Sequence, residues 1–352
     1  MKLLIAGDKT RFYHLEGFMN ALQKNDIKCK LIHDIEYSNK FFDINIKNRL
    51  GKQKKLKKLL DEFGPDVVLL DRLSGIATEI TKAGIPFFIL LRGNVWEELK
   101  WAKETIYTSP QKRLSILKKQ RFIKTCFNNA SVILPISKYL ENVVRKNIPK
   151  KNIELFSVDG RDPSEWNQVS GMNLKHPCVG LLQGMNVWGK TRELLTLTKV
   201  MKELPGVMFY FAGDGLYKDK IIPKLKNFKN FVWLGNLEYP IEVKKFLSEI
   251  DVYLLLSGME GLGQTIIEAL LMEKPVIATN IGGIPELIED GKTGFLIEAG
   301  NHDDLIKKIN QVFDQPVAAS DMGSKGKETM QENFNWDSIA KKFVLILNRN
   351  VQ

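Results

Sequence analysis

The sequence predicts an α/β protein made of two Rossmann-like domains. Short apolar segments alternate with helical patterns along the whole chain, which is typical of parallel sheets covered by helices on both faces. The alternation falls into two series with a polar stretch between them. The chain has 352 residues, of which 44% are hydrophobic, and this is enough for two domains with a core each.

The first series predicts six strands, at residues 3–6, 30–33, 66–70, 86–91, 132–135 and 153–156. Helices are expected between them at 15–23, 54–63, 76–82, 96–107, 114–128 and 138–146. Ligands of such sheets bind at the carboxyl ends of the strands. Two loops at such ends are therefore candidate binding loops, one beginning at Gly7 and the other at Arg92.

The second series follows a polar linker near residues 165–175, where Asp-Gly and Asp-Pro pairs favour turns. Strands are expected at 178–182, 207–211, 231–234, 252–256, 275–278 and 294–297. Helices are expected at 192–204, 217–225, 241–250, 263–272, 303–314, 318–332 and 336–349.

The most informative stretch is 257–297. Glu260 and Glu268 are separated by seven residues, with Gly261 and Gly263 between them and an apolar helical run after them. The glycines allow a tight turn, and the start of the following helix is expected to bind an anion through its N–H groups and its dipole. Two carboxylates beside an anion site suit a ligand with hydroxyls at both ends and phosphates in the middle. A nucleotide sugar is such a ligand.

The same stretch continues with Lys-Pro-Val-Ile at 274–277 and with Gly282-Gly283, three residues before Glu286. Together with the two glutamates, these motifs resemble family 4 of the retaining glycosyltransferases, which have the GT-B fold. Glu273 stands where that family usually has glycine. The segment 159–166 resembles the family's interdomain signature. The resemblance implies that the two domains face each other across a cleft.

The resemblance also divides the chain by role. Residues 1–165 are expected to bind the acceptor, and residues 166–335 are expected to bind a nucleotide diphosphate sugar. Residues 336–352 are expected to form a helix that crosses back to the first domain. The implied activity is the transfer of a sugar, most simply a hexose, with retention of its anomeric configuration.

The resemblance assigns roles to individual residues. Glu260 is expected to hold the sugar, and Glu268 the ribose. Lys190 is expected to stabilise the leaving diphosphate, so that no metal or other cofactor is needed. Other nucleotide-binding candidates are Gly184, Arg192, Gly213, Asp214, Gly215, Gly235, Asn236, Leu237, Gly261, Leu262, Gly263 and Gln264. Arg192 is the candidate substitute for an arginine of the family that is missing after Gly184. Arg92 occupies the place of a family histidine, and its charge favours an anionic acceptor.

Three other functions stay open. Residues 184–191 match the P-loop pattern G-x-x-x-x-G-K-T and would indicate an NTPase or kinase. No convincing Mg²⁺-binding aspartate follows them, and Asp214 fits the family's Gly-Asp-Gly loop. The family-like motifs would also fit a sugar-nucleotide epimerase on the same fold, or a non-catalytic protein that binds sugar nucleotides. A nucleic-acid partner is disfavoured, because the lysines lack interleaved aromatic residues.

The charge is uneven. Residues 1–165 contain 31 Lys and Arg against 19 Asp and Glu, whereas the rest of the chain is nearly neutral. Two basic segments, 47–60 and 112–124, have amphipathic helical patterns, which favour an anionic membrane surface. We therefore expect a peripheral protein on the cytoplasmic face of the membrane, with a lipid-linked acceptor such as a polyprenyl phosphate. The scattered Cys29, Cys126 and Cys178 fit a reducing, cytoplasmic setting.

Overall fold

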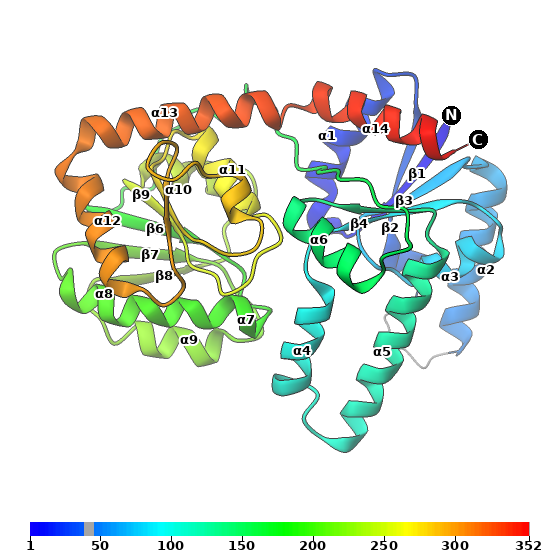
Figure 1. Cartoon of the computed structure of the whole chain (residues 1–352), viewed down its shortest axis with the longest axis horizontal. Coiled ribbons are helices and arrows are strands. Elements are labelled where there is room, and N and C mark those ends of the chain that lie inside the picture. Colours follow the sequence, from blue (N-terminus) through cyan, green and yellow to red (C-terminus); the bar gives the residue numbers. More distant parts are fainter. Residues whose placement is uncertain (39–45, 352) are drawn as a thin grey trace. The chain divides into compact units, whose positions relative to one another are not determined.

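The computed structural model describes residues 1–38 and 46–351, which form two compact units (Figure 1). Unit 1 contains Met1–Asn94, Ile106–Asp162 and Phe334–Gln352. Unit 2 contains Val95–Thr105 and Pro163–Asn333. The limits of the units lie near the expected divisions at 165 and 335, except that residues 95–105 group with unit 2.

Unit 1 is built on a five-stranded parallel sheet with the order β2-β1-β3-β4-β5. Its strands are β1 (Lys2–Gly7), β2 (Lys28–His33), β3 (Val67–Leu70), β4 (Phe87–Leu91) and β5 (Val132–Pro135). Every residue of β3 and β4 is buried, as expected for central strands with helices on both faces. The sixth expected strand, 153–156, is wrong: within it, Ile153 forms an isolated bridge with Ile133.

One helix follows each strand of this sheet in the sequence, except that two follow β4, and one more helix ends the chain. They are α1 (Phe12–Gln23), α2 (Ile46–Phe63), α3 (Ile76–Lys82), α4 (Val95–Thr105), α5 (Pro110–Asn129), α6 (Lys138–Asn147) and α14 (Trp336–Asn350), of which α4 belongs to unit 2. The expectation that the apolar face of α2 contacts a membrane is wrong. Leu56, Leu59 and Leu60, the apolar face that was expected to contact a membrane, are at most 8% exposed and belong to the core.

Helix α14 completes the core of unit 1 although it comes last in the sequence. It lies along α1 (Figure 1). The ring of Phe343 packs 5.2 Å from that of Phe18 and 5.0 Å from that of Phe156. Trp336 contacts Gly160, where a Cβ atom would lie 2.4 Å from the indole. The last helix is therefore part of the first unit's hydrophobic core.

Unit 2 is built on a six-stranded parallel sheet with the order β11-β10-β9-β6-β7-β8. Its strands are β6 (Cys178–Leu182), β7 (Met208–Ala212), β8 (Phe231–Gly235), β9 (Val252–Leu255), β10 (Val276–Thr279) and β11 (Phe295–Ile297). The order reverses between β6 and β9, which both lie at the centre of the sheet. Such a switch point is where ligands bind in open α/β sheets.

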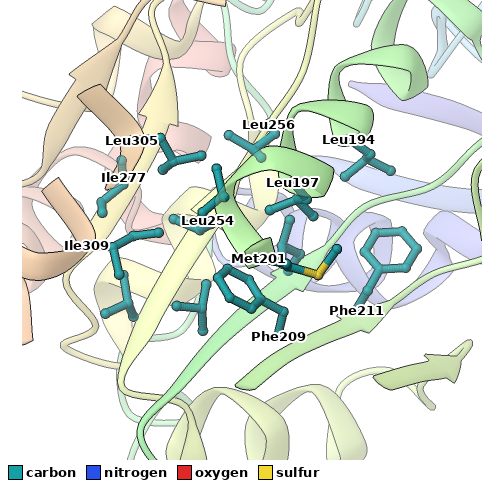
Figure 2. Close-up of a cluster of buried hydrophobic side chains, with 14 of the residues drawn as sticks. Leu194, Leu197, Met201, Phe209, Phe211, Leu254, Leu256, Ile277, Leu305 and Ile309 are labelled. Carbon is teal, nitrogen blue, oxygen red and sulfur yellow. The ribbon is translucent and has the colours of Figure 1, made fainter. Parts of the chain in front are cut away.

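The helices of unit 2 cover both faces of this sheet. After α4 they are α7 (Trp188–Thr191), α8 (Leu197–Glu203), α9 (Lys218–Leu225), α10 (Ile241–Glu249), α11 (Gln264–Leu271), α12 (His302–Asp314) and α13 (Pro316–Asn333). Figure 2 shows the core under α8 and α12, where Leu197, Met201 and Ile309 pack on side chains of β7 and β9. Among the described residues, no helix has the length and apolar character needed to cross a bilayer.

Candidate functional site

The predicted donor site lies in unit 2, in the loop that joins β9 to α11. The loop ends at Gly263, whose φ of 98° is left-handed and therefore favours glycine. Gly263 is the N-cap of α11, an apolar helix with six buried residues. The positive end of the helix dipole thus faces the loop that contains Glu260 and Gly261. This arrangement is the one that the Gly-x-Gly pattern predicts.

The structure brings Lys190 and Glu260 together. Lys190 Nζ lies 2.7 Å from Glu260 Oε1, which also accepts a hydrogen bond from the N–H of Gly261 at 3.1 Å. Both side chains are partly exposed, at 23% and 16%. Burial alone would lower the pKa of Lys190, but the attraction of Glu260 outweighs it and raises that pKa above its ordinary value. The lysine is therefore a cation at neutral pH, next to the start of α11.

Glycine contacts hold this pair in place. A Cβ atom at Gly258 would lie 2.3 Å from the carbonyl oxygen of Gly189, so the chain segments that carry Lys190 and Glu260 are in direct contact. Behind the loop, Gly282 has a φ of 61°, and a Cβ atom there would lie 1.9 Å from the carbonyl oxygen of Glu260. The Gly-Gly turn seen in the sequence thus packs directly against the loop that contains Glu260.

Glu268 lies on α11 and is only 4% exposed. Its Oε1 accepts a hydrogen bond of 2.9 Å from the hydroxyl of Tyr239, a residue that the sequence reasoning missed. Tyr239 comes four residues after the end of β8, and no motif marks it. Gln183 was also missed. It follows β6 and is 9% exposed, and its Oε1 has no hydrogen-bond partner among the residues that the structure describes.

The remaining nucleotide candidates form adjoining loops at the carboxyl ends of β6, β7 and β8. Gly213 (φ 147°) donates a hydrogen bond from its N–H to the carbonyl of Gly235. Its own Cβ position would lie 2.0 Å from the carbonyl oxygen of Gln183. Asp214 pairs with Lys218, and the N–H of Gly215 lowers the pKa of its carboxyl. Gly184 lies in the loop after β6, and Asn236 and Leu237 follow β8.

Arg192 lies beyond α7 and contacts a residue from the first half of the sequence. Its guanidinium stacks on the ring of Trp101 of α4, 4.6 Å from the ring centroid. Glu98 of the same helix adds a weaker attraction on Lys190. Sequence reasoning missed both residues, because it placed this helix in the first domain. Arg192 is exposed, which leaves its guanidinium accessible on one side.

The P-loop interpretation of residues 184–191 does not fit the geometry. In a P-loop, the final hydroxyl holds a magnesium ion and the lysine binds phosphate. Here the hydroxyl of Thr191 is fully buried and donates to the carbonyl oxygen of Val187 at 2.9 Å. The α-helix that begins within the pattern, α7, has only four residues. The sequence pattern matches, but the local structure is not that of a P-loop.

The two candidates in unit 1 lie at the carboxyl edge of its sheet. Gly7 ends β1 and contacts Leu15 and Asp71. Arg92 follows β4 and pairs with two buried aspartates, Asp71 at 2.6 Å and Asp159 at 2.7 Å. Arg11 lies 3.1 Å from the same oxygen of Asp159. These partners account for the charge of Arg92 without a ligand, so the structure gives no support to its expected contact with an acceptor phosphate.

Two groups of side chains come together that the spacing of the sequence did not reveal. His176, Cys178 and Asp251 are one group, and Asp8, His33 and Asp34 are the other; in each, ligand atoms lie within 4.8 Å of one another. Neither group includes a residue of the predicted donor site. His176 is instead hydrogen-bonded to Asp251 at 2.8 Å and to Glu249 at 3.1 Å, and these carboxylates raise its pKa.

Residues 189–329 match the family model of glycosyl transferases group 1. A trehalose synthase from Pyrococcus horikoshii is 31% identical over 229 residues, which cover 62% of this chain and 53% of that protein. An uncharacterized glycosyltransferase from Methanocaldococcus jannaschii is 25% identical over 90% of this chain and 84% of that protein. The chain spans about half the length of the trehalose synthases that it matches.

Solved structures show the same fold over the whole chain. Sucrose-phosphate synthase from Thermosynechococcus elongatus has a TM-score of 0.79 at 15% identity, covering 99% of this chain and 98% of that one. HepE from Anabaena, solved in complex with UDP-glucose, has a TM-score of 0.72 at 16% identity, covering 99% and 100%. The chain therefore has the GT-B fold, and its residues 189–329 match the glycosyl transferases of group 1.

Proposed function

We propose that this protein transfers a sugar from a nucleotide diphosphate sugar to an acceptor with retention of configuration. One observation carries the proposal: Lys190 and Glu260 meet at 2.7 Å beside the N-terminus of α11. A leaving diphosphate gains negative charge as the glycosidic bond breaks, and a fixed cation and a helix N-terminus stabilise that charge. The residues of the site supply both.

Each residue then has a defined task. In the free protein, Glu260 holds the ammonium of Lys190. When the donor binds, its diphosphate competes for Lys190, and the carboxylate of Glu260 becomes available to the hydroxyls of the donor sugar. Glu268, oriented by Tyr239, accepts hydrogen bonds from the ribose. Gln183 donates from its Nε2 to the carbonyl oxygen of Lys190 at 3.4 Å, and its Oε1 adds a buried acceptor next to that lysine's backbone.

The donor class is tested by ligand-dependent thermal stabilisation. HepE was solved with UDP-glucose, so UDP sugars are the first candidates. A ligand that binds only the folded protein raises the melting temperature by mass action. We expect UDP-glucose or UDP-N-acetylglucosamine to stabilise the protein more than GDP-mannose or ADP-glucose at equal concentration. A new sugar nucleotide formed from donor alone would indicate an epimerase, and binding without transfer or hydrolysis would indicate a non-catalytic protein.

The catalytic assignment is tested with Lys190→Ala. Removing one preorganised group that stabilises a developing anion costs about 10²–10³ in kcat. We expect a loss of at least about 100-fold in turnover, with activity of the wild type retained in EDTA. Lys202→Ala, an exposed lysine of α8, is the matched control and should keep wild-type turnover. Equal turnover in both variants, or dependence on a divalent metal, would contradict the assignment.

We further propose that α5 attaches the protein to the anionic inner face of the cell membrane. Leu114 and Leu117 are 58% and 52% exposed, in contrast to the buried leucines of α2. Arg113, Lys118 and Arg121 are exposed on the same helix. Apolar side chains surrounded by basic ones bind anionic bilayers, and each basic residue near the surface contributes about 1 kcal/mol.

Cosedimentation with liposomes tests this surface. Binding should require anionic lipid and should fall with added salt, because salt screens the attraction. The double variant Leu114→Ser/Leu117→Ser should lose most of the binding. Replacing Lys54, Lys55, Lys57 and Lys58 of α2 by Gln removes more charge but no exposed leucine, and should reduce binding less. Binding to neutral vesicles, or a double variant that binds normally, would contradict the role of α5.

A further inference from the structure

Unit 1 contains a cavity of 720 Å³ at the carboxyl ends of three neighbouring strands. Asp8 follows β1, Asp34 follows β2, and Arg72 comes two residues after β3, and all three line the cavity. Its volume is within the range of small-ligand sites, about 300–1,000 Å³, and accommodates one or two sugar rings. Its lining residues are all distinct from those of the donor site in unit 2.

Two buried polar atoms that line this cavity have no hydrogen-bond partner within residues 1–38 and 46–351. Ser74 is 5% exposed, and its Oγ is one of them. The other is Oδ1 of Asp34, a residue that is 6% exposed. Arg72 Nη2 lies 3.6 Å from this oxygen, which is close enough for an ion pair but too far for a hydrogen bond. Buried polar atoms are nearly always paired, so an exception needs a water or a ligand to explain it. Both atoms can accept a hydrogen bond from a hydroxyl.

The charges of the cavity select against an anion. Among the described residues, three carboxylates line it, Asp8, Asp34 and Glu79, against two guanidinium groups, Arg49 and Arg72. Arg72 is already committed to Asp8, at 2.6 Å. A divalent metal held by Asp8, His33 and Asp34 would lie close to this guanidinium, and the two cations would repel each other. A neutral ligand is neither repelled by the carboxylates, as an anion would be, nor repelled by Arg72, as a metal ion would be.

The apolar part of the lining fits the same ligand. The aromatic side chains Tyr37 and Phe122 line the cavity together with Ile35 and Leu73. Sugar rings combine polar hydroxyls with apolar C–H faces, and binding sites for such small molecules combine apolar walls with a few placed polar groups. Carboxylates, a serine hydroxyl, guanidinium groups and aromatic rings therefore occur here in one pocket.

We propose that this cavity binds a neutral, hydroxyl-rich ring, namely a sugar unit of the acceptor. Asp34 Oδ1 and Ser74 Oγ accept hydrogen bonds from two of its hydroxyls, and the guanidinium groups donate to its oxygens. The identification of this ligand as the acceptor rests on the proposed glycosyl transfer. This site differs from the expected contact of Arg92 with a phosphate both in its chemistry and in its residues.

The test is direct binding to the full chain, measured by saturation-transfer NMR and calorimetry. The probes are methyl glycosides of glucose, mannose and N-acetylglucosamine, with glucose 1-phosphate as the anionic probe and Mn²⁺ as the cationic one. We expect at least one methyl glycoside to bind. Asp34→Asn and Ser74→Ala should each weaken that binding, the former by about tenfold because the ligand hydroxyl then donates to a neutral amide oxygen in place of a charged carboxylate. Asp61→Asn, on the exposed face of α2, is the control and should bind normally.

Several outcomes would overturn the proposal: binding of glucose 1-phosphate or Mn²⁺ in place of the glycosides, no binding of any glycoside, or glycoside binding that neither variant weakens. UDP binding measured on the same samples separates the two proposals. A protein in which glycosides bind through Asp34 but no UDP sugar is transferred would retain this pocket and refute the proposed function. A protein that binds UDP sugars and transfers the sugar, but whose glycoside binding is unchanged in both variants, would retain the proposed function and refute this pocket.

Discussion

Lys190 of unit 2 and Arg92 of unit 1 are two cations that each pair with a carboxylate, but their surroundings differ. Arg92 directly follows β4, whereas Lys190 lies on α7 in the segment after β6, and each pairs with a carboxylate at 2.7 Å. Lys190 pairs with Glu260, and both members of that pair are partly exposed. Arg92 pairs with two carboxylates, and one of them, Asp159, is completely buried and shared with Arg11. The two cations therefore differ in the number of their carboxylate partners and in the burial of those partners.

This difference predicts opposite responses to truncation. A buried ion pair that loses one partner leaves an uncompensated charge, which costs about 3–5 kcal/mol. We expect Asp159→Ala to lower the free energy of unfolding of unit 1 by about this amount, because Arg92 and Arg11 lose their shared carboxylate. Glu260→Ala should abolish most transfer activity while changing stability by less than about 1 kcal/mol.

Thermal unfolding and turnover of the two variants check this contrast side by side. Loss of activity in Asp159→Ala without a change in its melting temperature would place this aspartate among the ligand-binding residues. The comparison between the two regions would then fail.

The Gly282-Gly283 turn, which packs against the loop that contains Glu260, offers a second test with a smaller expected effect. In Gly282→Ala, the new methyl group would lie 1.9 Å from the carbonyl oxygen of Glu260, in a backbone with positive φ. Gly291 also has a positive φ, of 75°, but no atom of the described residues lies within 4 Å of its Cβ position. Strain of the left-handed backbone costs about 1–2 kcal/mol in both variants, and overpacking adds about 1–3 kcal/mol in the first alone.

We therefore expect Gly282→Ala to lose donor affinity and more stability than Gly291→Ala. Calorimetric binding of UDP and chemical denaturation measure the two effects. Equal behaviour of the two alanine variants would mean that the Gly-Gly turn does not position Glu260.

A third prediction concerns acid stability in unit 1. Burial would raise the pKa of Asp8, but hydrogen bonds from Thr10 and the ion pair with Arg72 outweigh it and lower that pKa to about 2. A lowered folded-state pKa gives stability that is present above the unfolded value, 3.8, and is lost as the pH falls towards 2. With the side chain 25% exposed, the contribution is about 1–2 kcal/mol.

Asp8→Asn should therefore be less stable than the wild type at pH 7, and its stability should fall less steeply between pH 5 and pH 2. Denaturant titrations at a series of pH values measure this slope, with Asp61→Asn as the control. Parallel pH profiles of Asp8→Asn and the wild type would show that the ion pair with Arg72 contributes little.

The sequence predicted the fold and the glycine-containing loop before α11 for a physical reason. Strand and helix periodicity depends on local burial, and the β9–α11 loop depends on glycines that no other residue replaces without strain. Glu273 shows the limit of such patterns. It occupies a glycine position of the family with a φ of 57°, so the backbone conformation is kept although the residue has changed.

What the sequence could not predict depends on contacts between distant segments. Trp101, Tyr239 and Gln183 reach the donor site from three different places in the chain, and none of them has a local motif. The ion pair of Arg92 also left no sign in the sequence, because Asp159, its fully buried partner, is 67 residues away. The cavity of unit 1 likewise depends on residues from three strand ends, whose side-chain pairing only the folded structure reveals.

The place of α14 has a consequence for the order in which the protein matures on the ribosome. Synthesis proceeds from the N-terminus, and domains generally fold as units while they emerge. Phe18 and Phe156 leave the ribosome long before Phe343, which covers them in unit 1. The half of the protein that is translated first is thus completed last, after the residues of unit 2 have been made. Until Phe343 has been made, the surface formed by Phe18 and Phe156 lacks its cover. A chaperone that binds exposed apolar surface would act during this interval.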